Sequence, residues 1–217
     1  MADNVIVRGD AGFTLAPEGQ WQAVCADVID LGERVESYQG GTPKIVKKVA
    51  IVFQLSEINP DTARPFEPGT EKTLAFGPSA GLRKFLSQWR GKAYSDAEAA
   101  AGVSLAKLVG VNAIIQIEHK VSQSGRTYAK ISNIMPPMAK MPKLAVRDYE
   151  RSEHWAQRRD DYAAEAQRHR ASVVPVAATT KTRNGQPAHE ADDVRVENRM
   201  SHSFVEEALS FPDAPPF

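Results

Sequence analysis

The sequence contains a single cysteine, Cys25, so one chain cannot form an internal disulfide. It has no run of about eighteen apolar residues, the length that a membrane-spanning helix needs. Its first residues lack the charged and then apolar order that is typical of a secretory signal. We therefore expect a protein of a reducing, cytoplasmic environment with no membrane partner.

Motifs of common catalytic sites are also missing. The sequence has no glycine-rich phosphate loop, no dinucleotide-binding fingerprint and no nucleophile elbow. Its histidines are not spaced as metal ligands: they are His119, His154, His169, His189 and His202. Carboxylate pairs such as Asp160 and Asp161 lie in polar sequence, which would hold a general acid and base poorly. We predict no enzymatic activity, no cofactor and no metal.

The chain carries no net charge, because 27 Lys and Arg balance 27 Asp and Glu. The balance is uneven along the chain: residues 1–147 contain 18 basic against 14 acidic residues, and residues 148–217 contain 9 against 13. A mildly basic front and an acidic end suggest different partners for the two parts. A difference of four charges also fits ordinary scatter.

Patterns typical of β-strands fill much of the first two thirds of the sequence. Strands are predicted at 20–31, 44–57, 72–76, 111–118 and 126–134. The second is the strongest, because Phe53 shares a face with other large apolar residues while Lys48 and Gln54 fall on the opposite face. Turn residues at 122–125 would connect the last two strands.

Helical spacing interrupts this pattern between the third and fourth strands. Residues 79–91 place four large apolar side chains on one helical face: Leu82, Phe85, Leu86 and Trp89. Ser79 is the predicted N-cap and Gly91 the predicted C-terminal stop. A shorter helical pattern covers 95–109 and is closed by Gly110.

Three strands, a helix and two further strands form the element order of the oligonucleotide/oligosaccharide-binding fold (OB-fold). We therefore predict a mainly β domain over 1–146, a five-stranded OB-fold barrel with a helix between strands three and four. Another small antiparallel α+β sheet would have the same element order, so that alternative stays open.

The remaining sequence changes in character. Residues 147–171 form a densely charged segment that predicts an exposed helix with a thin apolar stripe of Trp155, Tyr162 and Ala166. Residues 172–217 are poor in large apolar side chains and are predicted to form a flexible linker and an acidic tail.

The fifth predicted strand carries the first candidate binding site. Arg126, Tyr128 and Lys130 fall on one face, while Ala129 and Ile131 fall on the other. An exposed ring between two cations suits a single strand of nucleic acid, because the ring stacks on a base and the cations meet phosphates. The alternative is an ordinary amphipathic strand with a solvated outer face.

Further candidates for DNA binding lie earlier in the chain. Lys44, Lys47 and Lys48 open the second strand and would meet phosphates. Trp21 is placed on the non-core face of the first strand as a second stacking platform, with packing at the barrel edge as the alternative. Tyr38, in the following loop, is a third candidate for stacking.

Four stretches resemble a phage-encoded group of single-stranded-DNA-binding proteins with this barrel. They are 23–32 (AVCADVIDLG), 82–92 (LRKFLSQWRGK), 108–110 (LVG) and 128–134 (YAKISNI). The resemblance covers residues from about 12 to about 137 and carries no catalytic residue. It implies a host-cell cytoplasmic location for such a phage-encoded protein.

The last residues resemble the acidic tip of bacterial single-stranded-DNA-binding proteins. In that family, acids precede a final Ile-Pro-Phe, and the terminal phenylalanine enters a pocket on a partner protein. The matching partner-binding residues are Glu206, Glu207, Asp213, Pro216 and Phe217. The resemblance implies recruitment of replication or recombination proteins, although the acids here are spread out.

These observations predict a protein that binds and protects single-stranded DNA with little sequence preference during phage replication or recombination. Its C-terminal tail would recruit partner proteins, and a homo-oligomer is compatible with the sequence. The alternative is a protein-interaction or scaffold module without nucleic-acid binding, which the near-neutral charge favours.

Overall fold

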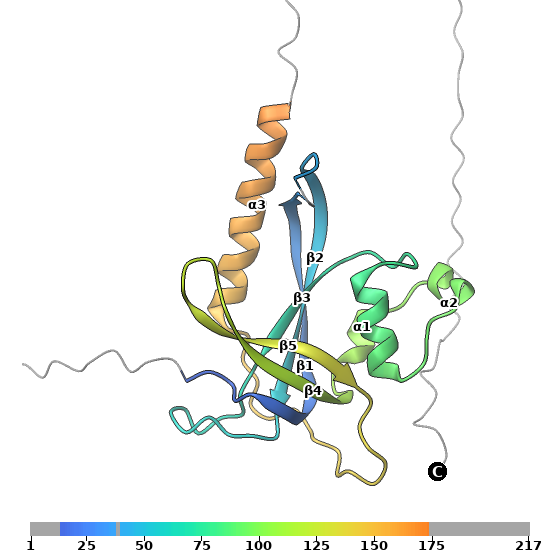
Figure 1. Ribbon diagram of the computed structural model, residues 1–217, viewed down its shortest axis with the longest axis vertical. Coiled ribbons are helices and arrows are strands. Elements are labelled where there is room, and N and C mark those ends of the chain that lie inside the picture. Colours follow the sequence, from blue (N-terminus) through green and yellow to red (C-terminus); the bar gives the residue numbers. More distant parts are fainter. Residues whose placement is uncertain (1–13, 38–39, 174–217) are drawn as a thin grey trace, which may run out of the picture. The chain divides into compact units, whose positions relative to one another are not determined.

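The computed structural model describes residues 14–37 and 40–173. They form one antiparallel five-stranded sheet of order β3-β2-β1-β4-β5, together with three α-helices (Figure 1). The strands are β1 (Gly19–Glu36), β2 (Lys44–Leu55), β3 (Gly69–Thr73), β4 (Asn112–Val121) and β5 (Thr127–Met135). The prediction of a mainly β chain with a helix between the third and fourth strands is therefore confirmed.

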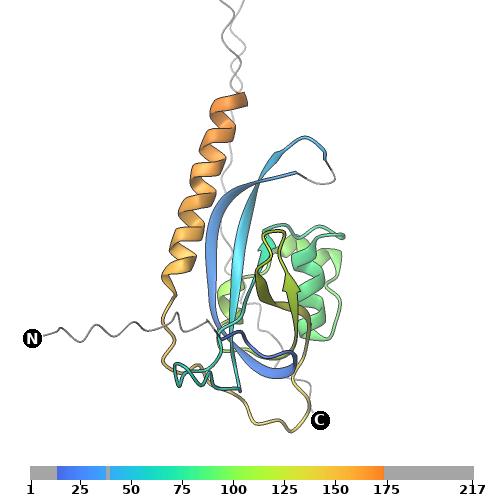
Figure 2. The same cartoon turned by 60° about the vertical axis from the view of Figure 1, so that its left-hand side comes forward.

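β1 is longer than its sequence pattern predicts because two irregularities break the period-two alternation. The register with β2 shifts between Cys25 and Asp27 and again between Asp30 and Gly32. Gly32 has a φ of 71°, which a residue with a side chain adopts only at a cost. The strand continues beyond Gly32 to Glu36 and forms a long curved hairpin with β2 (Figure 2).

The sheet does not close into a barrel, so this part of the prediction is not confirmed. The edge strands β3 and β5 approach each other, but no ladder of hydrogen bonds joins them in the part of the chain that the structure describes. β3 has only five residues, all paired with β2. Helix α1 (Gly81–Arg90) contacts both edge strands.

The concave face of the sheet, which we define by Cys25, Ile51 and Ile115, holds the larger core. α1 packs on this face through the four residues that its spacing predicts, Leu82, Phe85, Leu86 and Trp89. Phe53 is fully buried, and its ring lies 5.2 Å from the ring of Trp89.

Two helix boundaries differ from the prediction. The N-cap of α1 is Ala80 and not Ser79, because the Ala80 N–H first closes a turn onto the Gly77 carbonyl. Gly91 ends the helix with a φ of 71°, as predicted. The helical pattern 95–109 divides into α2 (Asp96–Ala101) and a 3-10 turn (Leu105–Leu108), since Gly102 has a φ of 85°.

The convex face, which we define by Ile29, Ala50 and Val52, is covered by α3 (Glu153–Val173) (Figure 2). The buried residues of α3 are Trp155, Tyr162 and Ala166, the stripe that the sequence predicts. The charged C-terminal segment therefore packs on the sheet. No helix among residues 14–37 and 40–173 is long and apolar enough to span a membrane.

Side-chain amides attach the irregular segment between β5 and α3 to the sheet. Gln54, only 1% exposed, hydrogen-bonds the backbone N–H and carbonyl of Arg147, both at 2.8 Å. Asn112 does the same for Leu144, at 2.7 and 2.9 Å. These bonds satisfy buried polar groups and lead the chain to the convex face.

Candidate nucleic-acid interface

Tyr128 lies on β5, an edge strand of the sheet, and is 43% exposed. Ala129 and Ile131 point to the concave core, and Ile131 is buried there. Alternation therefore places Tyr128 and Lys130 on the opposite face, as the sequence predicts. An exposed ring on a rigid strand is available to stack on a base.

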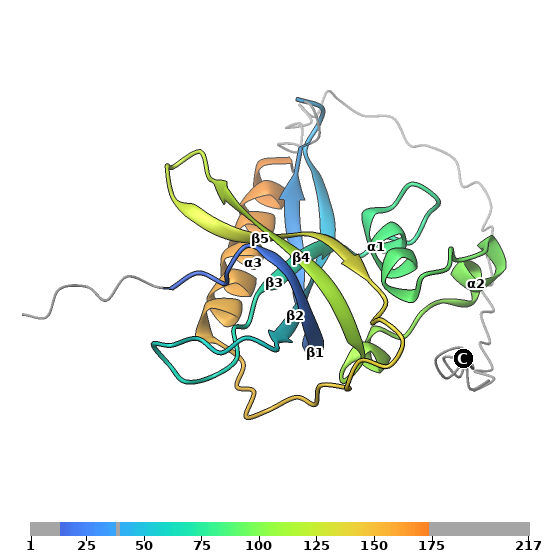
Figure 3. The ribbon, with the colours of Figure 1, turned by 60° about the horizontal axis from the view of Figure 1, so that its bottom comes forward.

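The turn between β4 and β5 fixes the backbone of Arg126, two residues before Tyr128. The Ser122 N–H bonds the Arg126 carbonyl at 2.8 Å, and the Arg126 N–H bonds the Ser122 hydroxyl at 3.0 Å. Gly125 has a φ of 78°, which the turn requires. In Figure 3 this hairpin points away from α1 and α2, and residues 126–128 are exposed.

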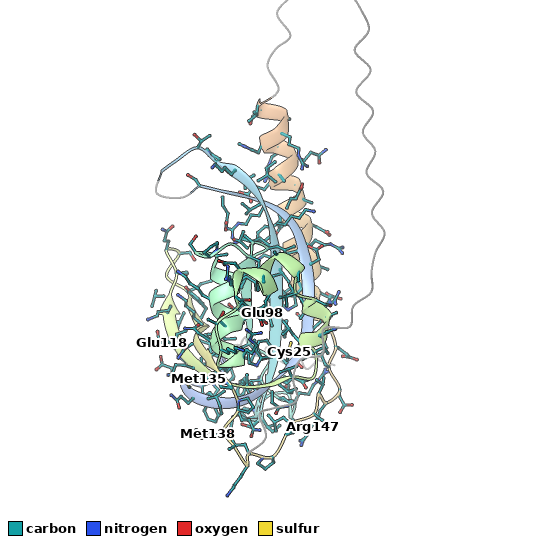
Figure 4. The ribbon with its side chains drawn as sticks, turned by 90° about the vertical axis from the view of Figure 1, so that its right-hand side faces the viewer. Cys25, Glu98, Glu118, Met135, Met138 and Arg147 are labelled. Atoms are coloured by element: carbon teal, nitrogen blue, oxygen red, sulfur yellow. The ribbon has the colours of Figure 1, made fainter. Side chains whose placement is uncertain are left out.

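The charges on the neighbouring strand are partly neutralised. Lys120, paired in register with Tyr128, forms an ion pair of 2.8 Å with Glu118. The hydrogen bond from Lys120 lowers the pKa of Glu118, which stays ionised. Figure 4 shows Glu118 at the rim of the sheet, away from Cys25 in the interior. Lys130 lies opposite Glu118 in the ladder and its charge also lowers the pKa of Glu118, but within the described residues the ion pair of Glu118 is with Lys120.

The β1–β2 hairpin presents two of the three lysines that the sequence singles out. Lys44 and Lys47 are exposed. Lys48 is 7% exposed, and its Nζ lies 2.6 Å from a Glu36 carboxylate oxygen and 3.1 Å from the Thr73 hydroxyl. The charge of Lys48 is thus paired inside the protein, and its predicted contact with phosphates stays a prediction.

Trp21 does not lie on the non-core face, so the prediction of its position is wrong. It is paired with Ile115 and is half-buried against the concave core. Its indole N–H donates to the Pro17 carbonyl at 2.9 Å. Both faces of this stretch of β1 are buried, Ala23 and Cys25 on the side of Trp21 and Val24 and Ala26 on the other, so the alternation does not show which face holds the larger core. Its surroundings match the alternative role, packing against neighbouring side chains.

Several predicted residues lie outside the described part of the chain. Tyr38 is one of them. The partner-binding residues of the tail are the others: Glu206, Glu207, Asp213, Pro216 and Phe217. Their roles stay predictions.

The structure adds one cation that the sequence pattern does not single out. Lys72 on β3 is paired with Val49 and so points to the concave side, where its ammonium lies 4.6 Å from the centre of the Phe85 ring. Burial lowers the pKa of Lys72, and the charges of Lys130 and Lys48 lower it further. Lys72 and Lys130 are 58 positions apart, so no local pattern could have associated them.

No protein-family model and no curated protein sequence matches the chain.

Proposed function

We propose that the protein binds single-stranded DNA with little sequence preference and that it acts by binding, not by catalysis. The observation that carries this proposal is the exposed ring of Tyr128 on the edge strand β5, with Lys130 on the same strand and Arg126 in the turn just before it. Stacking accepts any base, because every base has a π-face, and the flanking cations would contact the phosphates on either side.

We further propose that the curved sheet is an OB-fold in a partly open form. Its element order and the position of α1 between β3 and β4 support this assignment. In such folds the loops after the first and fourth strands border the binding groove. Lys44 and Lys47 beside the first of these loops would then add phosphate contacts to those of Arg126 and Lys130.

Substitution of Tyr128 tests the proposal directly. Tyr128→Ala should weaken binding of fluorescent oligothymidine by about 1–3 kcal/mol, or about 5-fold to about 150-fold, because one stacking platform is lost. Tyr128→Phe is the matched control, since it keeps the ring and should bind almost as the parent does. The measurement is fluorescence anisotropy, with urea unfolding to show that each variant is folded.

A folded Tyr128→Ala protein with the parent's affinity would remove Tyr128 from the site. Failure of the parent itself to bind oligothymidine at low salt would reject the function.

A protein-interaction module is the second candidate, and the internal pairing of cations favours it. Lys48 is paired with Glu36, and Lys120 with Glu118. Salt separates the two functions, because release of counterions makes the affinity for DNA fall steeply as the salt concentration rises.

In the proposed role, the acidic segment 206–217 would recruit replication or recombination proteins.

A further inference from the structure

The two edges of the sheet meet at a place that we call the β3–β5 seam, defined by Lys72 and Lys130. β3 and β5 approach each other there without forming a ladder, and α1 contacts both strands. The seam lies on the strand that carries Tyr128, and Lys130 is two residues beyond that ring on the same face. Two residues along a strand span about 6.8 Å.

The seam brings like charges together. Burial lowers the pKa of Lys72 most, and the nearby charges of Lys130 and Lys48 lower it further. Lys48 has its own counterion, Glu36, at 2.6 Å. Neither Lys72 nor Lys130 forms an ion pair with any residue in 14–37 or 40–173.

Other half-buried charges of the sheet have ion-pair partners. Asp27 is held by Arg151 at 2.8 Å, and Glu71 by Arg158 at 2.8 Å. A partly desolvated charge normally has such a partner, because an unpaired one raises the free energy of the folded state. At the seam, Lys72 has no carboxylate partner within the described structure, and Glu118, the carboxylate opposite Lys130, is already ion-paired with Lys120. An anion from outside would therefore relieve the repulsion between Lys72 and Lys130.

We propose that the β3–β5 seam is a phosphate-binding site, in which Lys130 and Lys72 carry the backbone of a DNA strand from the base stacked on Tyr128 across to β3. This inference rests on the proposed function and adds Lys72, with a path for the strand from the outer face of β5, which carries Tyr128 and Lys130, across the edge where β3 and β5 approach each other. The ring of Phe85 stabilises the position of the Lys72 ammonium through a cation–π contact.

The test compares three variants of the full chain with the parent by anisotropy of fluorescent oligothymidine over a range of salt concentrations. Lys72→Met removes the charge and keeps an apolar side chain over Phe85. Lys130→Gln removes the second charge at an exposed position. Lys84→Gln, at an exposed position of α1, is the matched control for the loss of one positive charge.

Each seam variant should weaken binding about 3-fold to about 10-fold at low salt and reduce the slope of log K against log salt by about 0.7. Lys84→Gln should keep the parent's slope, and Lys72→Arg should restore it. Urea unfolding identifies any Lys72 variant that is less stable. Lys130→Gln then tests the seam independently, because Lys130 is exposed and its substitution should not affect folding.

Two outcomes are distinct. A parent that binds oligothymidine, with Lys72→Met and Lys130→Gln showing the same affinity and slope, would overturn the seam and leave the proposed function intact. A parent that does not bind would reject the function, and the seam with it.

Discussion

The two faces of the sheet are covered by different kinds of contact. On the concave face, α1 adds four large apolar side chains to a continuous core that includes Phe53 and Ile115. On the convex face, α3 buries only Trp155, Tyr162 and Ala166 against a small apolar group. Much of the remaining convex contact is polar.

The polar contacts of the convex face repeat one arrangement. Asp27 on β1 accepts hydrogen bonds from Tyr149 at 3.1 Å and from Arg151 at 2.8 Å. Glu71 on β3 accepts them from Tyr162 at 2.6 Å and Arg158 at 2.8 Å. In each case a half-buried carboxylate of the sheet receives a phenol and a guanidinium from the C-terminal segment.

Because of this difference, the contacts on the two faces should respond differently to pH and salt. Apolar burial is insensitive to pH and little affected by moderate salt, whereas carboxylate contacts depend on ionisation. Loss of the concave core should unfold the sheet, while loss of the convex contacts should release α3 first.

The largest effect is expected in the concave core. Phe53→Ala should lower the free energy of unfolding by about 3–5 kcal/mol, because it removes a fully buried ring and leaves a cavity beside Trp89. Urea denaturation measures this change. A cost below about 1 kcal/mol would show that the concave core does not hold the sheet together.

An intermediate effect is expected where α3 meets β3. A Cβ at Gly69 would lie 2.5 Å from the Trp155 ring, so Gly69→Ala should displace α3 at a cost of about 1–3 kcal/mol. Gly77→Ala is the matched control, because its Cβ would meet nothing within 4 Å. Limited trypsin digestion should cleave at Arg158 and Arg159 faster in the Gly69 variant. Equal cleavage in both variants would contradict this role of Trp155.

The smallest of the three effects is expected from Glu71 and depends on pH. Burial alone would raise the pKa of Glu71, but the hydrogen bonds from Tyr162 and Arg158 outweigh it, so the folded pKa is lowered. Burial raises the pKa of Tyr162 to about 12, which keeps the phenol protonated as a donor. Glu71→Gln should therefore cost roughly 1–2 kcal/mol at neutral pH.

This cost should disappear in acid. As the pH falls, the Glu71 carboxylate of the unfolded chain takes up a proton near the ordinary glutamate pKa of about 4.3. In the folded protein it does so only at a lower pH. The contribution of Glu71 is therefore complete well above the unfolded pKa and is lost as the pH falls through the lower folded pKa. Urea unfolding of parent and variant from pH 7 to pH 3 measures the difference, and a constant difference would contradict the ionic origin.

The sequence by itself predicted the features that depend on local periodicity. The buried stripes of α1 and α3, the core position of Phe53 and the opposite faces of Tyr128 and Ile131 all follow from spacing within one element. Such patterns are visible because neighbouring side chains on a face share an environment.

Only the tertiary structure decided the features that join distant parts of the chain. The sequence groups Lys48 with Lys44 and Lys47 as a candidate for phosphate contacts, but Glu36 and Thr73 from other strands pair with its ammonium. β3 and β5 approach without a ladder, and Lys72 comes near Lys130 at that point. The physical reason is that burial and charge pairing depend on three-dimensional distance, which the order of residues along one strand does not contain.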